Sequence, residues 1–349
     1  MPTYRALGVM SGSSLDGLDL ALCTLRIRAG RWSFRIERAR TFAYEEGLRS
    51  RLAQAMGGSA IELAHLDADL GDFNGRTGKR FLRGERVDLI ASHGHTIFHQ
   101  PAKGFSTQIG SGSRIAAITG ITTVCDFRSA DIAHGGQGAP LVPMGEKLLF
   151  PGHKAFLNIG GICNISLHGA RSVIGYDVCI GNQALNHLAS EAGLPFDRNG
   201  DIARSGTVNQ DLLKRLNALP FHRQRPPRSL GREWFEEAMR PLIQDSSMAL
   251  ADRMRTVTEH IAMQLAKALA SAQGPVLATG GGARNSFLIG RLSALSRAPI
   301  EVPSPEVVDF KEALVFALLG VLRLRGEANS LASVTGARRD SVGGAVHLP

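Results

Sequence analysis

The sequence predicts an α/β fold made of two similar halves, and three observations support this prediction. Strand-like and helix-like runs alternate along all 349 residues. Many of the 40 glycines form clusters, and several clusters directly follow an apolar, strand-like run. The order strand, glycine turn, strand occurs near residue 7 and again near residue 157. We therefore expect two α/β halves that divide near residues 130 to 140.

The first half is expected to open with three strands and to continue with helices that alternate with shorter strands. Alternating or continuous apolar residues favour strands, and apolar residues at three- and four-residue spacing favour helices. The expected strands are 4–10, 18–27, 32–37, 87–92 and 122–125, and the expected helices are 49–55, 61–83 and 114–119.

The second half repeats this order. Strands expected around 156, at 164–167 and at 172–177 precede helices at 182–192 and 211–217. A long helix at 254–270 leads to a strand at 276–278, a glycine-rich turn and a helix at 287–295. A last helix is expected at 311–325. Because no further set of strands follows Asp309, we expect this helix to return to the first half.

The chain is basic, with 40 Lys and Arg against 31 Asp and Glu and a formal net charge of +9. Such a charge raises the question of a nucleic-acid partner. The basic residues are spread along the chain without a run of five or six, and aromatic residues make up only 6%. We therefore expect a basic surface that attracts anionic metabolites, and no nucleic-acid partner.

Cysteine use and hydropathy indicate a cytoplasmic protein. The cysteines form no CxxC pair and no Cys/His cluster with zinc spacing, so we expect reduced, buried thiols at Cys23, Cys125, Cys163 and Cys179. The most apolar stretch, 313–322, is too short to cross a bilayer. No basic segment followed by an apolar one opens the chain. We expect no membrane partner.

Three glycine loops are candidates for phosphate binding, because glycine leaves backbone N–H groups open to a close ligand. The loops follow expected strands at 11–17, 160–161 and 279–285. A plain turn explains each loop when it is taken alone, and no GxxxxGK[ST] motif is present. The third loop precedes a helix and suits a nucleoside. Three such loops in this order favour phosphate binding between two α/β halves.

Two polar segments at expected strand ends are candidates for chemistry. The first contains Ser92, His93, His95, Thr96 and His99, and it follows a strand where open α/β sheets bind ligands. Its histidine spacing permits a metal site, but no carboxylate lies nearby and hydroxyl recognition also explains the Ser and Thr.

The second segment is 175–177, which ends in Asp177. A carboxylate at a strand end is a candidate general base. The alternative is an N-cap or turn aspartate before the helix expected at 182. The local sequence leaves both open.

Longer motifs resemble those of the 1,6-anhydro-N-acetylmuramic acid kinases. In chain order they are GVMSGSSLDG at 8–17, SHG at 92–94 with Thr96, DFR at 126–128, GGQGAPLVP at 135–143, LNIGGICN at 157–164, GGGARN at 280–285, Glu312-Ala313 and SVTGA at 333–337. These motifs are long and uncommon, and the match runs nearly end to end. The chain is therefore identified as a member of this family.

The resemblance implies the fold of sugar kinases, heat-shock protein 70 and actin. This is a two-domain actin-like ATPase (ribonuclease H-like) fold of the α/β class, with an interdomain active-site cleft and a mixed five-stranded sheet in each domain. The first domain is expected at 1–130 plus approximately 311–349, and the second at 131–310. The resemblance also implies ATP and Mg²⁺ as cofactors, a small-molecule amino-sugar substrate, a homodimer and a cytoplasmic location.

The family's reaction and residue roles carry over by resemblance. Water opens the 1,6-anhydro ring at C1 and the γ-phosphoryl group goes to O6, which gives N-acetylmuramic acid 6-phosphate in cell-wall (peptidoglycan) recycling. Asp177 falls on the catalytic base. ATP and its phosphates are expected at Gly12, Ser13, Ser14, Leu15, Asp16, Gly17, Leu18, Asp19, Gly160, Gly161, Gly280, Gly281, Gly282 and Asn285. The sugar is expected at Ser92, His93, Thr96, Arg128 and Glu312, and Mg²⁺ at Asp16 and Asp19.

Several positions depart from the family's pattern. After the base, the family's Thr-Gly-Pro is replaced by Val178, Cys179 and Ile180, so we expect the turn there to take a different backbone path. An Asp is replaced by Asn186 and a Gln by His95. An Arg that contacts the sugar is replaced by Ala130, a loss worth about 1.5 to 3 kcal/mol in carboxylate recognition if nothing compensates.

These departures leave two alternatives to the family's activity. One is a paralogous kinase for another amino sugar. The other is a nucleotide-binding protein that has lost phosphoryl transfer.

Overall fold

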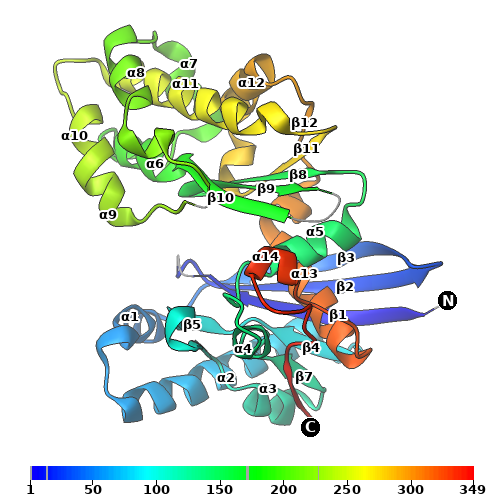
Figure 1. Ribbon diagram of the computed structural model, residues 1–349. Coiled ribbons are helices and arrows are strands. Elements are labelled where there is room, and N and C mark those ends of the chain that lie inside the picture. Colours follow the sequence, from blue (N-terminus) through cyan, green and yellow to red (C-terminus); the bar gives the residue numbers. More distant parts are fainter. Residues whose placement is uncertain (1, 13–14, 170–172, 227) are drawn as a thin grey trace. The chain divides into compact units, whose positions relative to one another are not determined.

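The computed structural model describes residues 2–12, 15–169, 173–226 and 228–349, and the chain forms two compact units (Figure 1). The first unit comprises Met1–Pro151 and Phe310–Pro349, and the second comprises Gly152–Asp309. The last helix therefore belongs with the first unit, as expected. Residues 131–151 also belong with it, whereas the sequence analysis placed them in the second half.

Packing explains this difference in the division. Helix α5 (Val142–Leu149) packs on strand β3 (Arg31–Phe42). The ring of Phe150, at the end of this helix, lies 5.3 Å from that of Phe34 in an edge-on contact. These apolar contacts hold the segment against the first sheet.

The first unit contains a six-stranded sheet in the order β13-β7-β4-β1-β2-β3. Strands β1, β4 and β7 are parallel, and the other neighbouring pairs are antiparallel. The strands are β1 (Thr3–Ser11), β2 (Leu18–Arg28), β3, β4 (Leu89–Ser92), β7 (Thr123–Cys125) and β13 (Ala345–His347). The last of these was not expected from the sequence, because three residues carry too little pattern. A separate hairpin, β5 (His95–Gln100) with β6 (Phe105–Ile109), was also not expected.

Helices cover both faces of this sheet. Leu7 and Gly8 are neighbours on β1 and therefore point to opposite faces. A Cβ on Gly78 of α2 would lie 3.5 Å from Leu7, and a Cβ on Gly8 would overlap the backbone of Ala313 in α13. The helices of the unit are α1 (Glu46–Gln54), α2 (Ala60–Leu82), α3 (Gly112–Thr119), α4 (Ser129–Ala133), α5, α13 (Pro305–Leu324) from Phe310 onward, and α14 (Ala332–Thr335).

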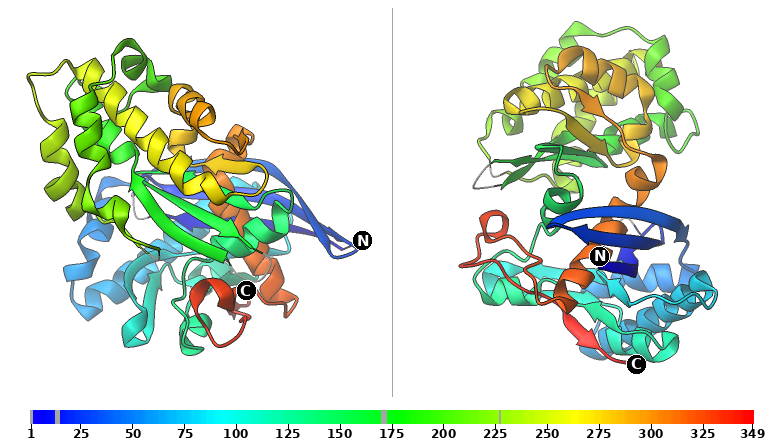
Figure 2. Two further views of the ribbon diagram at one scale, coloured as in Figure 1. Left: turned by 45° about the horizontal axis from the view of Figure 1, so that its top comes forward. Right: turned by 90° about the vertical axis from the view of Figure 1, so that its right-hand side faces the viewer.

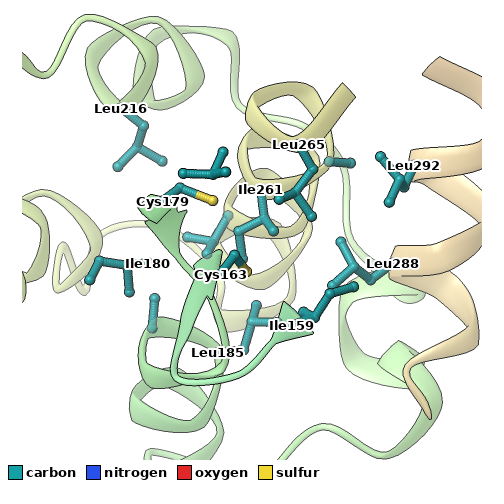
Figure 3. Close-up of a cluster of buried hydrophobic side chains, with 14 of the residues drawn as sticks. Ile159, Cys163, Cys179, Ile180, Leu185, Leu216, Ile261, Leu265, Leu288 and Leu292 are labelled. Atoms are coloured by element: carbon teal, nitrogen blue, oxygen red, sulfur yellow. The ribbon is translucent and has the colours of Figure 1, made fainter. Parts of the chain in front are cut away.

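The second unit contains a five-stranded sheet in the order β10-β9-β8-β11-β12. Its strands are β8 (Ala155–Ile159), β9 (Ile162–His168), β10 (Val173–Ile180), β11 (Val276–Thr279) and β12 (Ile300–Glu301). Its α-helices are α6 (Asn182–Ser190), α7 (Asp201–Ser205), α8 (Gln210–Asn217), α9 (Arg232–Trp234), α10 (Arg240–Ile243), α11 (Leu250–Ala268) and α12 (Ser286–Leu295). The core lies between β9, β10 and the long helix α11, where Cys163, Cys179 and Ile261 meet (Figure 3).

Two further views show the helices and the sheet of each unit (Figure 2). Short helical turns complete the two units. They are η1 (Ala55–Gly57), η2 (Pro101–Lys103), η3 (Arg198–Gly200), η4 (Pro220–Arg223), η6 (Leu269–Ser271) and η7 (Gly281–Arg284), together with a π-helical turn η5 (Phe235–Met239). The α/β class is confirmed, and the strands and helices expected on both sides of the division are present with bounds shifted by a few residues.

The thiols and the helix lengths also follow the sequence analysis. All four cysteines are free, and Cys23, Cys163 and Cys179 are buried, while Cys125 is half-buried. None of the helices in the described ranges is long and apolar enough to cross a membrane.

Candidate active site

Polar segments of the first unit gather at one edge of its six-stranded sheet. Strands β1, β4 and β7 run parallel in neighbouring positions, so they end at the same edge. The segments that follow them begin at Gly12, His93 and Asp126. Open α/β sheets bind ligands at the carboxyl ends of their strands. This edge is therefore the candidate ligand site of the first unit.

A buried hydrogen-bond chain anchors the hairpin that connects β1 and β2. Tyr44 Oη donates to Ser11 Oγ at 2.7 Å, and Ser11 Oγ lies 2.8 Å from His95 Nδ1. All three side chains are buried. Burial raises the pKa of Tyr44 to about 12 and lowers the pKa of His95. Both groups are therefore neutral at neutral pH, and they hold the end of β1 in place.

The hairpin itself needs special backbone geometry. Leu15 has a φ of 58°, in the left-handed region. At Gly17 a Cβ would lie 2.6 Å from the carbonyl oxygen of Phe42, so a larger residue does not fit. Leu18 is fully buried in the core, and thus contributes packing to the hairpin. The predicted phosphate residues Ser13 and Ser14 lie outside the described residues.

Two carboxylates stand at this hairpin, Asp16 and Asp19. Asp16 is exposed, and Asp19 is half-buried and accepts a hydrogen bond from Thr41 Oγ1 at 2.5 Å. Mg²⁺ usually takes one or two carboxylates from a protein and its other ligands from phosphate and water. Asp16 and Asp19 are therefore of the right chemical type to supply the carboxylate ligands of such an ion. Among the described residues, no group of three or more His, Cys, Asp or Glu side chains is arranged to hold a metal.

His93 and Arg128 form a hydrogen-bonded pair at the same edge. Arg128 Nη2 lies 2.7 Å from His93 Nε2, and His93 Nδ1 lies 2.9 Å from Gly94 O. Because arginine can only donate, Nε2 accepts and Nδ1 carries the proton. Burial, and then the charge of Arg128, lower the pKa of His93 to about 3. Arg128 also donates to the carbonyl oxygen of Gly138 at 2.7 Å.

The other predicted sugar residues are differently exposed. Ser92 is fully buried at the end of β4, Thr96 is half-buried on β5, and Glu312 is exposed on α13. The charge of Glu312 interacts with those of Asp19 and Arg128. The structure therefore brings Asp19, Arg128 and Glu312 into one neighbourhood of the first unit.

Asp177 of the second unit lies inside β10, which corrects the expectation that it ends a strand. The strand continues to Ile180, with a bulge between Asp177 and Cys179. Val178, Cys179 and Ile180 are buried in the hydrophobic core, so these apolar residues extend the strand where a turn was expected (Figure 3). A bulge bends a strand and changes the direction of its side chains.

Asp177 is held by a segment that follows the turn η4. Leu230 N–H donates to Asp177 Oδ2 at 2.9 Å, Asp177 N–H donates to Arg228 O at 3.1 Å, and Arg228 Nε donates to Asp177 O at 3.1 Å. Burial raises the pKa of Asp177, while the Leu230 N–H and then the Arg228 charge oppose this rise. The alternative of an N-cap is wrong, because Gly181 is the N-cap residue of α6.

The second glycine loop forms the turn between β8 and β9. The carbonyl oxygens of Gly160 and Gly161 accept hydrogen bonds from the N–H groups of Gly181, Asn182 and Gln183 at the start of α6, at 2.8 to 3.2 Å. A Cβ on Gly161 would meet only Gln183, at 3.9 Å. The space beside Gly161 is therefore open to a ligand.

The third glycine loop borders a pocket of about 640 Å³ within the second unit. Among the predicted nucleotide residues, Gly281, Gly282 and Asn285 line it, and Gly280 directly precedes them. A Cβ on Gly282 would lie 2.2 Å from Ile159, whereas a Cβ on Gly281 has room, 3.6 Å from Asn182. Asn285 also caps α12, because its Oδ1 accepts from Leu288 N–H at 3.0 Å. The remaining lining includes Asn186, Phe196, Arg198 and Asn199.

Comparison with known proteins shows the family to which the chain belongs. A family model described as anhydro-N-acetylmuramic acid kinase matches residues 4–349. The chain belongs to this family. Kinases of this name from Gloeobacter violaceus and Vibrio cholerae are 37% and 36% identical to it. The alignments cover 99% of both chains in the first case and 98% of both in the second. The resemblance found in the sequence is confirmed, and the anhydro-N-acetylmuramic acid kinase family makes the chain an ATP-dependent sugar kinase.

Solved structures that resemble this chain are more distant. Component A of (R)-2-hydroxyglutaryl-CoA dehydratase from Acidaminococcus fermentans is 13% identical with a TM-score of 0.48, over 90% of this chain and 96% of that one. A ROK family glucokinase from Streptomyces griseus, in complex with glucose and AMPPNP, is 12% identical with a TM-score of 0.41, over 90% and 98%. The two strand orders given above define the fold of this chain.

Sequence reasoning missed two residues beside Asp177, namely Arg228 and Leu230. Both lie in a basic, proline-containing segment without a helical or strand-like pattern. Leu230 contacts Asp177 through its backbone N–H, and Arg228 does so through its guanidinium and its backbone carbonyl. No sequence motif of the anhydro-N-acetylmuramic acid kinase family quoted above includes them, so no local signal pointed to them.

The pair of His93 and Arg128 predicts an unusual titration. Between about pH 5 and 8, where histidines ordinarily titrate, nitrogen NMR should show His93 neutral with the proton on Nδ1. In Arg128→Leu, the pKa of His93 should rise because the repelling charge of Arg128 is lost, although burial still keeps this pKa below its ordinary value.

The same shift has a consequence for stability. The unfolded chain takes up this proton near the ordinary value of 6.5, and the folded chain takes it up only near 3. Folding stability contributed by His93 should therefore fall as the pH drops below 6.5. A His93 ring that titrates near 6.5 in the wild-type protein would contradict the buried neutral pair.

Proposed function

We propose that this chain is an ATP-dependent kinase that opens 1,6-anhydro-N-acetylmuramic acid with water and phosphorylates O6. The product is N-acetylmuramic acid 6-phosphate, and the reaction serves peptidoglycan recycling. The observation that carries this proposal is the relation to kinases of that name over 98% or more of both chains. A cytoplasmic location and a homodimer remain predictions of the resemblance.

The nucleotide is assigned to the glycine loops. The pocket beside Gly281 and Gly282 takes the nucleoside, since it offers open space next to bare backbone at the turn before α12. Phe196 is a large apolar side chain at this pocket with 51% of its surface exposed, which suits a contact with a base. Contacts to phosphate are assigned to the hairpin at Gly12 in the first unit and, separately, to the turn at Gly160-Gly161 in the second. Asp16 and Asp19 would hold Mg²⁺, which when bound would offset negative charge on the phosphate oxygens.

Asp177 is assigned the role of general base. Its Oδ2 accepts the Leu230 N–H, and in the described part of the chain no hydrogen bond engages Oδ1, which is then available for a proton. The carboxylate takes a proton from water as the water oxygen bonds to C1 of the sugar and the C1–O6 bond breaks. O6 then bonds to the γ-phosphorus, and the bond from this phosphorus to the bridging oxygen breaks and releases ADP.

The sugar's lactyl carboxylate needs a cationic partner, and Ala130 cannot supply one. Arg128 is the candidate. It lies two residues before Ala130, and among the described residues its Nε is a buried donor without a hydrogen-bond partner. The two other nitrogens of its guanidinium are already bound to His93 and Gly138. Nη1 and Nη2 each keep a second N–H beside these hydrogen bonds, so Arg128 has donors left for this carboxylate.

The role of the base is tested by Asp177→Asn. The amide keeps the size of the side chain but cannot take the proton, so turnover should fall by roughly two to four orders of magnitude. ATP affinity, measured by calorimetry, should stay close to that of the wild-type protein. A variant with wild-type turnover would reject Asp177 as the base.

The nucleotide site is tested by Gly281→Val. The new side chain fits the backbone, because its Cβ lies at ordinary contact distance from Asn182, but it extends into the pocket. Calorimetry should show ATP affinity reduced about tenfold or more, with an unchanged unfolding midpoint. The matched control is Gly290→Val, at an exposed glycine of α12 with nothing near its Cβ. Equal ATP affinity in both variants would exclude this pocket.

The substrate is tested with two sugars on one preparation. The wild-type protein should show a higher kcat/KM for anhydro-N-acetylmuramic acid than for the anhydro form of N-acetylglucosamine, which has no lactyl group. Arg128→Ala should raise KM for the first sugar only, and Ala130→Arg should leave it unchanged or lower it.

Three results would contradict these expectations, and each would point to a different explanation. Equal or better use of the anhydro N-acetylglucosamine would favour the alternative of another amino-sugar substrate. A preference for the muramic sugar that survives Arg128→Ala would show that another residue binds the carboxylate. ATP binding without turnover on either sugar would favour the protein that has lost phosphoryl transfer.

A further inference from the structure

Strand β10 carries the proposed base at the edge of its sheet, and a loop segment completes this edge. In the order β10-β9-β8-β11-β12, the described part of the chain places a strand on one side of β10 only. On its other side Asp177 exchanges two hydrogen bonds with Arg228, from Asp177 N–H to Arg228 O and from Arg228 Nε to Asp177 O, both at 3.1 Å. An edge strand with open backbone groups is weakly fixed. The segment therefore fixes the strand at the residue that carries the carboxylate.

Among the residues that the structure describes, the guanidinium of Arg228 binds four backbone carbonyls and no carboxylate. Besides Asp177 O, it donates to Val178 O at 3.4 Å, and its Nη1 donates to Phe221 O at 3.1 Å and Gln224 O at 2.9 Å. Its central carbon also lies 4.7 Å from the ring centre of Phe221 and 5.4 Å from that of Tyr176. One side chain thus ties the turn η4 to two consecutive carbonyls of β10.

The carbonyl groups of Asp177 and Val178, which Arg228 binds, lie at an irregular point of β10. The bulge of β10 falls between Asp177 and Cys179, so pairing with β9 is irregular at Val178. At a bulge the extra residue is left out of the ladder and the strand bends. The guanidinium of Arg228 donates to the carbonyl oxygens of Asp177 and Val178, which lie at this irregular point of the strand. It therefore sets the direction in which the Asp177 side chain leaves the strand.

Charge adds a second effect. Burial favours the neutral carboxylic acid at Asp177, and the Arg228 cation favours the carboxylate. The other titratable or charged groups around this position are Tyr176 and Cys179 on β10, Cys163 on β9, His222 on η4, and His260 and Lys267 on α11. Burial lowers the pKa of His222 to about 4 and that of His260 to about 3, so both are neutral at neutral pH. Within the described ranges, Arg228 is thus the cation that acts on Asp177 itself.

We propose that Arg228 is the positioning residue of the catalytic base, which fixes the bulged backbone of Asp177 through its carbonyl contacts and keeps the carboxylate ionised through its charge. This inference rests on the proposed role of Asp177. It adds a residue that the motifs quoted above do not include to the machinery of the reaction. Lysine can supply the charge but not the carbonyl contacts, because an ammonium group lacks the planar fork that spans several carbonyls.

The test compares three variants by the pH dependence of kcat/KM. In Arg228→Gln the acidic limb should move to higher pH, because loss of the cation makes the base harder to ionise. Its turnover at the optimum should fall by roughly 10- to 100-fold, the cost of a misplaced base. Arg228→Lys keeps the charge, so its acidic limb should stay near that of the wild-type protein while its turnover falls. The matched control Arg225→Gln removes the same charge from an exposed position of the segment and should change neither.

Two outcomes overturn the inference. An acidic limb of Arg228→Gln at the wild-type pH excludes the effect of charge. Full turnover in Arg228→Lys excludes the fork as a positioning device, and this variant decides the question if Arg228→Gln does not fold. Thermal unfolding of each variant separates these effects from a loss of structure.

A carbon NMR titration of the Asp177 carboxyl keeps this inference separate from the proposed function. It is recorded in the wild-type protein, Arg228→Gln and Arg225→Gln, with Asp177→Asn to assign the signal. The carboxyl should titrate at higher pH in Arg228→Gln alone. If the wild-type protein turns over neither anhydro sugar, the proposed function fails, and the titration still tests Arg228. A carboxyl that titrates at the same pH in all three proteins overturns the role of Arg228.

Discussion

The first unit depends on the close contact between helix α13 and the backbone of its sheet. A Cβ on Gly8 would lie 1.8 Å from Ala313 O, one on Gly320 would lie 2.6 Å from the Cβ of Ala91, and one on Gly145 would lie 2.4 Å from Val315. Helix, sheet and α5 can approach this closely only because these positions lack side chains. The contact also fixes the site. Gly8 lies four residues before the hairpin at Gly12, so α13 holds Glu312 at the edge of the sheet where Asp19 and Arg128 lie.

A buried carboxylate joins two further motifs of this unit. Asp131 is fully buried and accepts hydrogen bonds from Gly138 N–H, Ser330 Oγ and Thr335 Oγ1, each at 2.8 Å. A buried charge is tolerated when donors satisfy it in this way. The motifs at 135–143 and 333–337 are therefore connected through Asp131. Both motifs come from the resemblance, and this connection gives them a structural role at the segment that carries Arg128.

The sequence allowed the architecture and the glycine loops to be predicted because both depend on local patterns. Apolar periodicity marks strands such as β2 and helices such as α11, and glycine clusters mark the turns at their ends. The strand end at Asp177 was predicted wrongly, since an apolar run of three residues fits a strand as well as a turn. Arg228 could not be found from such patterns. Its bonds go to backbone carbonyls, which every residue possesses, and its partners lie up to 51 positions away in the sequence.

The residues that depart from the family pattern beside the proposed base act through the core, and this limits what they can change. Val178, Cys179 and Ile180 are buried within the cluster around Ile261 and Leu216 and extend β10 by apolar packing. They leave the carboxylate of Asp177 with one backbone donor and its second oxygen available, in the part of the chain that the structure describes. A change of this kind alters how the base is supported, and the support then comes from the segment 228–230. Under the proposed mechanism, catalysis therefore needs Arg228 and Leu230 as much as Asp177.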